Sequence, residues 1–536
     1  MLDDTTRPSA PLHPALAPLG RVVSISGGRL IVLLDDAPGP AGGLQVGALV
    51  KFARPRAEVF GLVEGLQMVP GEHGELRMAE IVLIGEVSEA AATPGRAFRR
   101  GVSSMPCLDE AALPTGGDDT AAVYALPRRQ TIRLGTVHQA PEVAACVATD
   151  DLLGRHFAVV GTTGSGKSCA VASLLDGIVQ ANPGGHVLLL DLHGEYRFGG
   201  LAEHMTVDRL RLPYWVLTLE ELVQVFFGAE AEDRAAEALC LRGLVTRARQ
   251  AYAGGGQEAS AITVDTPIPY LLSEFSRLIE AELGKMDNRA AGIGPYQRIK
   301  VRLADLQADR RFAFLFPTGM AMRDNLAGLL GQLFRIPSMG RPLCVLDLVG
   351  VPAEVLNVVV AVIARLAFDL AVAAGNSIPL MLVAEEAHRY APREAVGGFE
   401  ACVRGLARLA KEGRKYGISL GVVTQRPADL ADSILSQCGT VLAFRTVNEA
   451  DQSSVRAALT DASSALVNSL PLLGNGEALI VGEGVPVPMR VRLAHLPEDK
   501  RPRSNSARFS ERWQDRDPDA AVLDQVIAGW RRGKAP

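Results

Sequence analysis

The chain has 536 residues, which is more than one hydrophobic core usually organises, so its length predicts roughly two to four domains. With 55 basic and 60 acidic residues, its formal net charge of −5 excludes a surface that attracts nucleic acid over its whole area. Contacts with DNA would have to be local, as in the lining of a channel. The seven cysteines occur singly and without metal-ligand spacing, a pattern typical of reduced thiols in the cytoplasm.

No segment of the sequence predicts membrane insertion. The first 18 residues lack the basic-then-apolar layout of a signal peptide. The most apolar long stretch, 356–374, is interrupted by Asn357, Arg365 and Asp369, which favours a buried core helix over a membrane span. We therefore expect a soluble cytoplasmic protein without a membrane partner.

Short apolar runs separated by glycine and proline dominate residues 20–87. The pair Gly27-Gly28 separates the first two runs, which indicates a β-hairpin. We predict a small β-barrel, preceded by an N-terminal extension at 1–19 and followed by a surface connector at 88–129 that is rich in Ala, Gly and Pro. The barrel and its connector together span 20–129. The predicted strands are 21–25, 29–34, 47–52, 59–63 and 80–87.

Residues 130–496 alternate between strand and helix patterns, which predicts an α/β domain with a mostly parallel sheet. Four runs in it are apolar throughout, as strands buried on both faces should be. These runs are 186–190, 343–346, 380–383 and 418–423. Between 201 and 341 the pattern predicts a helical insertion with helices at 235–251, 270–283 and 296–308, and a loop at 254–256. Residues 497–536 are expected to form a C-terminal arm that ends in an amphipathic piece at 520–530.

A phosphate-binding motif follows the apolar run 157–160 and precedes a helical pattern at 169–179. It fits G-x-x-x-x-G-K-[ST] in the strand–loop–helix context that this motif requires. Its glycines let backbone N–H groups turn toward a triphosphate, and the helix N-terminus favours negative charge. We expect Lys167 to reach the β- and γ-phosphates, Ser168 to hold Mg²⁺, and Cys169 to complete the ATP-binding segment. The motif is Gly161-Thr162-Thr163-Gly164-Ser165-Gly166-Lys167-Ser168.

Two adjacent acids, Glu385 and Glu386, end the buried run 380–384. A buried strand that delivers acids at its C-terminal end is the second half of a P-loop ATPase site. Because side chains alternate along a strand, we assign Glu385 to the metal and Glu386 to the attacking water. The alternative is a solvated acidic pair that opens a helix, where the dipole favours negative charge.

Asp191 and Gln425 follow two other buried strands and have two interpretations each. Asp191 could contact Mg²⁺ or the nucleotide through water, or it could build a turn with the glycine at 194. Gln425 could sense the γ-phosphate, or it could cap the end of its strand.

Two arginines are candidates for a contact with a phosphate across a subunit boundary. Arg414 ends a helix that begins near residue 400, and Arg155 precedes the P-loop strand. Basic residues in the last turn of a helix often only offset its dipole, which is the alternative for Arg414. The loop 388–393 mixes basic and aromatic groups after a strand end, so it is our candidate for a channel-facing element; a plain surface loop is the alternative.

In this order, the motifs resemble those of the HerA family of ring-forming ATPases, relatives of the FtsK DNA pumps. The matching blocks are 161–168, 191–196, 385–388 and 412–417, which leads to 424–427. The segments 153–157 and 444–446 and the N-terminal strands are also similar, so the resemblance covers about 20–495. Two positions depart from the usual form: Leu192 stands where the family often has proline, and Glu385 where it often has aspartate.

The resemblance implies a RecA-like P-loop ATPase that works as a homohexamer on double-stranded DNA with ATP and Mg²⁺. It also implies a partner, such as the nuclease NurA in archaea or a defence effector in bacteria, because this chain shows no nuclease motif. Two functions follow: an ATP-driven DNA translocase or helicase, or an ATP-gated ring scaffold that holds an effector with little movement on DNA. Both use the same nucleotide site, and DNA-stimulated ATP hydrolysis would favour the motor.

Overall fold

The computed structural model describes residues 17–35, 44–55, 57–71, 74–88, 97–126, 129–228, 234–254, 259–285, 290–316, 324–395, 398–459, 464–503, 510, 513 and 520–531. Most of the predicted N-terminal extension and of the loop at 254–256 lies outside these residues. Internal contacts divide the chain into two compact units. The first contains 1–152, 160–166 and 439–494, and the second contains 153–159, 167–438 and 495–536.

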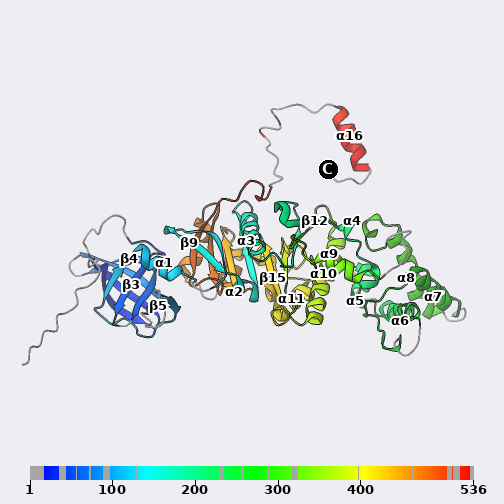
Figure 1. Ribbon diagram of the computed structural model, residues 1–536, viewed down its shortest axis with the longest axis horizontal. Helices are drawn as coiled ribbons and strands as arrows, with labels where there is room; N and C mark the ends of the chain where they lie inside the picture. The colour runs from blue at the N-terminus through cyan, green and yellow to red at the C-terminus, as the bar shows by residue number, and fades with distance from the viewer. Residues whose placement is uncertain are drawn as a thin grey trace, which may run out of the picture. The chain divides into compact units, whose positions relative to one another are not determined.

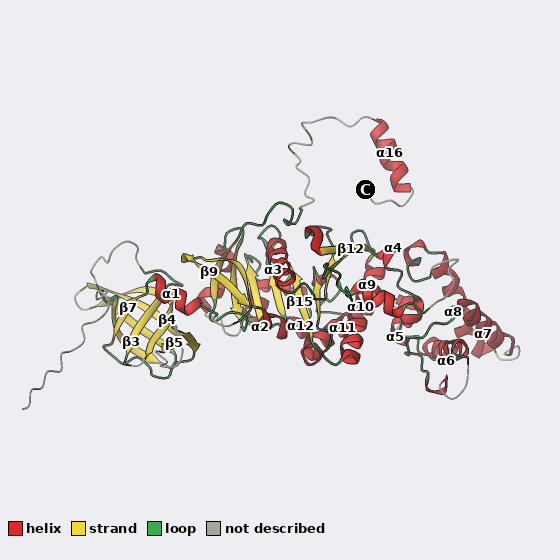
Figure 2. Cartoon of the chain, in the orientation of Figure 1, coloured by secondary structure: helices red, strands yellow, loops and turns green. Residues whose placement is uncertain are grey.

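The N-terminal part of the first unit is a closed barrel of six strands (Figure 2). It closes because β2 pairs with β1 on one side and with β5 on the other. Residues that alternate along the strands point inward and form its core, including Val32, Phe52 and Ile81. The strands, in their order around the barrel, are β2 (Arg29–Leu34), β1 (Gly20–Ser26), β7 (Ala111–Pro114), β3 (Leu49–Arg54), β4 (Ala57–Gly71) and β5 (Gly74–Ser88).

The prediction of a surface connector at 88–129 is wrong in part, because this segment supplies one of the strands of the barrel. Within it, β7 pairs antiparallel with both β1 and β3, and Ala112 is buried in the barrel. The connector also contains the edge strand β6 (Ala97–Arg100), paired with β5, and the helix α1 (Gly117–Tyr124). A four-residue strand has too few positions to show alternation, and alanine and proline are poor strand formers, so the sequence carries no signal for β7.

The remainder of the first unit is an antiparallel sheet in the order β16, β17, β18, β8, β9. The prediction of a mostly parallel sheet therefore does not describe this unit. Its strands are β16 (Thr440–Phe444), β17 (Glu477–Gly482), β18 (Met489–Leu493), β8 (Thr131–Val137) and β9 (Ala140–Ala148). The short helices α13 (Glu449–Ala458) and α14 (Ser464–Asn468) lie between β16 and β17 in the chain.

The second unit contains the parallel sheet, in the order β12, β13, β11, β14, β15, β10. Its central strands are buried over almost their whole length, as their uninterrupted apolar runs predicted. The strands are β12 (Ala202–Thr206), β13 (Leu343–Asp347), β11 (Val187–Asp191), β14 (Leu380–Ala384), β15 (Ile418–Thr424) and β10 (Phe157–Val160). β12 is the edge strand of this sheet. Its mixed polarity does not predict a buried strand, so the predicted insertion at 201–341 includes it.

Three longer helices accompany this sheet: α3 (Lys167–Ala181), α10 (Ala353–Ala374) and α11 (Glu400–Glu412). Among the described residues, α10 is the only helix long and apolar enough to cross a membrane, but most of it is buried inside the protein. It packs against α11, and it also contacts β14 and β15, which confirms the prediction of a core helix.

The insertion is helical, as predicted (Figure 1). The helices α6, α7 and α8 pack against one another, and α5 packs against α6 and α8. The side chain of Arg249 on α6 is fully buried and donates to four backbone carbonyls, including those of Trp215 and Leu217, so it fixes the loops around it. The helices are α5 (Leu219–Phe227), α6 (Ala235–Tyr252), α7 (Leu272–Lys285), α8 (Ala290–Ala308) and α9 (Leu326–Leu333). The predicted amphipathic piece near the C-terminus is the helix α16 (Ala520–Arg531).

Candidate nucleotide-binding site

The phosphate-binding loop connects β10 to α3 and has the backbone that its glycines predict. Gly161, Gly164 and Gly166 have φ values of 147°, 74° and 115°, a region that residues with a Cβ rarely adopt. At Gly161 a Cβ would also lie 2.5 Å from the Cβ of Phe444. The loop is fastened to the end of β16, because Thr162 donates its backbone N–H to the carbonyl of Arg445 over 2.9 Å. Residues 163–164 form its exposed part, and the backbone of such a glycine-rich loop is a typical binding element for phosphate.

Lys167 is the first residue of α3 and interacts electrostatically with Glu385 and Glu386, the acids that the sequence predicted for the same site. Its side chain is buried, which lowers the pKa of its ammonium group. The negative charges of Glu386, Glu385 and Glu195 oppose this shift and favour the charged form. The fold thus gathers, around one lysine, acids that lie 28 to 219 positions further along the chain, counted from 167 to 195 and from 167 to 386.

Glu385 is buried at the C-terminal end of β14 and is well placed for a cation. Its Oε1 accepts a hydrogen bond from the hydroxyl of Tyr196 over 3.0 Å, and its Oε2 has no hydrogen-bond donor among the described residues. Burial raises the pKa of Glu385 well above its ordinary value, and the negative charge of Asp191 raises it further. A buried carboxylate with an unsatisfied oxygen beside a second carboxylate fits the oxygen ligands that Mg²⁺ prefers. Ser168, another of the three predicted ligands, lies half-buried in the first turn of α3.

Glu386 differs sharply from its neighbour in conformation and partners. Its φ of 49° is in the left-handed region, which non-glycine residues rarely adopt. Its Oε1 accepts a hydrogen bond from the side-chain amide of Gln425 and lies 3.7 Å from Nε2 of His193. Burial raises the pKa of Glu386, but the bonds from His193 and Gln425 and the charges of His388 and Lys167 outweigh it and hold the pKa below its ordinary value. Glu386 therefore stays ionised beside Lys167, as a base that orients water must.

His193 and His388 contact Glu386, although the sequence had assigned no role to His193 and had placed His388 only in the candidate channel-facing loop 388–393. His193 follows β11, and its contact with Glu386 raises the pKa of its imidazole. Nδ1 of His388 lies 3.4 Å from Oε2 of Glu386 and 3.0 Å from the hydroxyl of Thr424. Their positions within the motif blocks were the only available signal, because contact with Glu386 depends on the packing of three strands.

Asp191 at the end of β11 shapes the turn that follows, which is the alternative that the sequence left open. Its Oδ1 accepts backbone N–H groups from residues 193, 194 and 195 at 2.8 to 3.3 Å, and its Oδ2 accepts the N–H of Tyr196 over 3.2 Å. This turn carries Tyr196 to Glu385 and His193 to Glu386. Asp191 therefore positions two partners of the acids, and a contact of its own with Mg²⁺ stays a prediction.

Arg155 and Arg414 lie at the amino ends of their strands, whereas Lys167 follows the carboxyl end of β10. Arg155 precedes β10 and Arg414 precedes β15, whereas the P-loop and Gln425 follow these two strands. Both arginines are exposed. They share a neighbour in the buried His156, whose Nδ1 accepts the backbone N–H of Leu420 over 3.0 Å. Burial lowers the pKa of His156, and the nearby Arg414 guanidinium lowers it further. Neither arginine can therefore reach the nucleotide site of its own chain.

The loop 388–393 differs from its description as a mixed basic and aromatic surface. Tyr390 is fully buried and donates its hydroxyl to the backbone carbonyl of Glu385 over 2.8 Å, so its ring cannot stack on a base. Arg393 is exposed but pairs with Asp432. Of the basic groups in this loop, Arg389 is exposed and remains a candidate for DNA contact.

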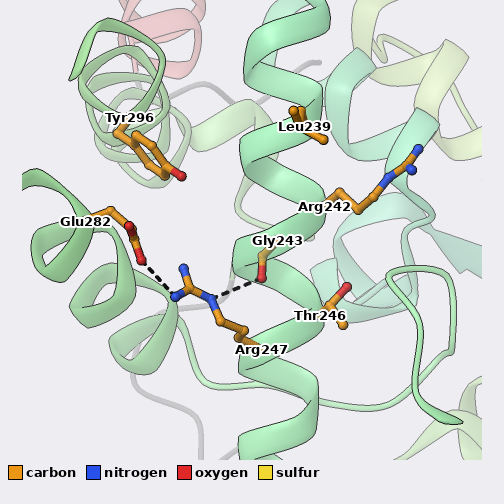
Figure 3. Close-up of a pocket in the computed structure, with 7 residues that line it drawn as sticks. All are labelled: Leu239, Arg242, Gly243, Thr246, Arg247, Glu282 and Tyr296. Atoms are coloured by element: carbon orange, nitrogen blue, oxygen red, sulfur yellow. Dashed lines mark hydrogen bonds and ion pairs between the residues drawn. The ribbon is translucent and has the colours of Figure 1, made fainter. Parts of the chain in front are cut away.

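A separate pocket lies in the insertion between α6, α7 and α8 (Figure 3). Arg247 on α6 reaches toward α7 and pairs with Glu282 over 2.8 Å, and Tyr296 and the exposed Arg242 also line the pocket. None of the predicted site residues lines this pocket. Asp191, Glu385 and Gln425 lie elsewhere, at the carboxyl ends of β11, β14 and β15.

Comparison with known proteins yields a consistent set of relatives. Residues 132–367 match the family model described as the central domain of helicase HerA. The DNA double-strand break repair helicase HerA of Pyrococcus furiosus is 26% identical over 464 residues, which cover 80% of this chain and 79% of that protein. The protein of the same name from Sulfolobus acidocaldarius is 22% identical over 387 residues, which cover 70% and 72%.

Among solved structures, the chain is similar to VirB4 of Thermoanaerobacter pseudethanolicus. The TM-score is 0.50 at 16% sequence identity, and the match covers 70% of this chain and 99% of that structure. At this identity the likeness concerns the fold: the parallel sheet with its P-loop belongs to the P-loop ATPase architecture that the sequence predicted.

Proposed function

We propose that the chain is a HerA-type helicase, because its residues 132–367 match the central domain of helicase HerA, and that it is an ATP-driven motor that moves or unwinds double-stranded DNA. The proposal includes a homohexameric ring in the cytoplasm, ATP bound at subunit boundaries, and a nuclease or defence effector as partner. One observation carries the enzymatic part: the lysine at the start of the P-loop helix interacts electrostatically with two buried acids that follow β14, a strand that β15 separates from the P-loop strand β10.

Each residue of the site has a separate task in this proposal. The loop 161–166 and the N-terminus of α3 bind the polyphosphate, and Lys167 neutralises charge at the β- and γ-phosphates. Ser168 and Glu385 would hold Mg²⁺, which supplies further charge neutralisation on the phosphates. Asp191 contributes by holding the turn that presents Tyr196 to Glu385.

Glu386 orients the attacking water and accepts its proton, because it is the ionised acid next to Lys167. In this structure its carboxylate is bound by the amide of Gln425, so its orientation depends on that side chain. Gln425 also lies at the end of β15, next to the strand that carries the acids, which suits it to respond to the γ-phosphate. The proposed role of Gln425 as a sensor of the γ-phosphate rests on its hydrogen bond to Glu386.

The alternative function, an ATP-gated scaffold that holds an effector, shares this site and differs in its response to DNA. A motor couples hydrolysis to movement, so duplex DNA should accelerate its ATP turnover severalfold or more. A scaffold should hydrolyse ATP at the same rate with and without DNA but change its affinity for the effector. The relatives named as DNA repair helicases favour the motor.

The proposal is tested with two variants and a matched control. Lys167→Ala should lose ATP hydrolysis together with most ATP affinity, whereas Glu386→Gln should keep ATP affinity and lose turnover, because the acid acts only in the chemical step. Glu394→Gln, an exposed acid near the same loop, should leave both unchanged. Normal turnover in Glu386→Gln, together with a loss in Glu385→Gln, would show that the two roles are reversed. Normal turnover in Lys167→Ala would refute the ATPase assignment.

A further inference from the structure

His156 is a buried histidine that joins two strands of the parallel sheet. It follows Arg155 directly and precedes β10, and the residue is only 2% exposed. Its Nδ1 accepts the backbone N–H of Leu420 in the neighbouring strand β15 over 3.0 Å. An imidazole nitrogen that accepts a hydrogen bond carries no proton, so the ring is neutral, and burial favours the same form by lowering the pKa of His156. The ring therefore ties the amino end of β10 to β15 through one defined atom.

The backbone of His156 shows that this position requires its side chain. Its φ is 58°, in the left-handed region where a Cβ is unfavourable. His156 follows the short helix α2 (Thr149–Gly154), and a left-handed residue after a helix is usually glycine. Glycine would remove the strain, but it could not accept the N–H of Leu420, which would become a buried donor without a partner. A strained residue that supplies one specific contact is typical of functional positions.

The contact with β15 determines where Arg155 lies. Leu420 donates to His156, and one residue further along both strands the ring of Phe157 packs on Gly421, where a Cβ would lie 2.4 Å from it. Because the two contacts are consecutive in both strands, they fix the register of β10 against β15. Arg155 is exposed and immediately precedes these contacts, so its backbone is held next to the beginning of β15.

Arg414 is held against the same part of β15. Gly413, the residue before it, packs on the strand, because a Cβ there would lie 3.3 Å from both the Cβ and the carbonyl oxygen of Ile418. Ile418 is two residues from Leu420, the partner of His156. The pKa of His156, already lowered by burial, is lowered further by the guanidinium of Arg414, which agrees with this proximity. Both exposed arginines thus lie on segments that are fastened to residues 418–421.

We propose that His156 is a positioning residue that holds Arg155 and Arg414 where they can contact the nucleotide of a neighbouring subunit, which rests on the proposed function as a ring-forming ATPase. It acts through its hydrogen bond to Leu420 and does not touch the nucleotide, because it precedes β10 whereas the P-loop follows this strand. Misplacing a catalytic group by about 1 Å can lower a rate by about 10²-fold. Loss of this bond should therefore reduce turnover while the subunit still binds ATP.

Turnover and ATP affinity of the assembled full chain test the proposal. His156→Gly and His156→Asn form a matched pair, because both residues tolerate a left-handed backbone but only asparagine has a side-chain oxygen that can accept the N–H of Leu420. His156→Gly should lower the rate at saturating ATP by about 10²-fold, and its dissociation constant for ATP, measured in EDTA, should equal that of the wild type. His156→Asn should recover most of the rate. If His156→Gly does not fold, His156→Leu takes its place, because it fills the same space without an acceptor.

Mixing of subunits separates this role from a general loss of structure. His156→Gly subunits mixed with Lys167→Ala subunits should regain part of the activity, because some boundaries then combine an intact P-loop with correctly placed arginines. Glu386→Gln subunits mixed with the same Lys167→Ala subunits are the control and should regain none, because every nucleotide site then lacks one of its own groups.

Three results would overturn the proposal: wild-type turnover in His156→Gly, equal impairment of His156→Asn and His156→Gly, or no recovered activity in mixed assemblies shown to exchange subunits. A loss of ATP affinity that accounts for the lower rate of His156→Gly would also contradict it, because the arginines act on the neighbouring site. A wild-type chain that hydrolyses no ATP would instead refute the proposed function, and that result is distinct from an active wild type with an equally active His156→Gly variant.

Discussion

Arg414 should be essential for ATP hydrolysis and should act on the nucleotide of a neighbouring subunit. It precedes β15, and the nucleotide site lies beyond the other end of that seven-residue strand. At about 3.3 Å per residue the strand separates the two by roughly 20 Å, which is more than an arginine side chain spans. Across that distance in water, two unit charges interact by only about 0.2 kcal/mol. An effect of Arg414 on its own site would therefore be negligible.

An arginine that reaches a phosphate from a neighbour contributes roughly 10³–10⁵ in rate in other P-loop enzymes. Arg414→Ala should thus lower turnover by about 10³-fold or more at saturating ATP. The adjacent exposed Lys415→Ala is the matched control and should retain activity. Mixing Arg414→Ala subunits with Lys167→Ala subunits should restore part of the activity, because some boundaries then combine an intact lysine with an intact arginine.

The absence of any recovered activity, at all mixing ratios and in assemblies shown to exchange subunits, would refute a role in trans for Arg414. Arg155, which lies at the same edge beside His156, would then be tested in the same way. Full activity of the Arg414→Ala variant by itself would favour the alternative interpretation, in which Arg414 only offsets the dipole of its helix.

Three further outcomes are expected. Glu477→Gln should weaken ATP binding severalfold, because Glu477 pairs with Arg490 over 2.6 Å and accepts the backbone N–H of residue 474. The turn that it holds donates the N–H of residue 476 to the P-loop carbonyl at 165, so unchanged affinity in a titration would show that Glu477 does not support the P-loop. Glu86→Gln should destabilise the protein in urea by about 1.5–3 kcal/mol at pH 7, since Ser103 donates two hydrogen bonds to this buried carboxylate. Those bonds lower the pKa of Glu86, so the stabilisation is complete above the ordinary pKa, and the gap between variant and wild type should close as the pH falls through the lowered pKa; a gap that persists in acid contradicts it. Arg389→Ala should make the slope of log affinity against log salt concentration less negative by about 0.9 for each phosphate contact that the assembled protein loses on duplex DNA, without changing DNA-free hydrolysis. An identical slope would show that this residue does not contact DNA in the channel.

Local patterns in the sequence were sufficient for most of the elements and for the backbone of the predicted nucleotide-binding loop. The glycines of the P-loop determine its backbone through positive φ, which is a property of single residues. Uninterrupted apolar runs predicted β11, β13, β14 and β15 because both faces of a central parallel strand are buried. Helical periodicity located the insertion, because the pattern that predicts each helix lies within about 20 consecutive residues.

Only the tertiary structure decided which side chains become partners across long separations in the chain. Tyr196 reaches Glu385 across 189 positions and Gln425 reaches Glu386 across 39, and neither pairing has a local signature. The turn role of Asp191 and the burial of Tyr390 likewise depend on which groups the sheet brings near them. The physical reason is that hydrogen-bond partners and burial are set by the packing of several strands together, whereas residue spacing reports only on the strand or helix in which it occurs.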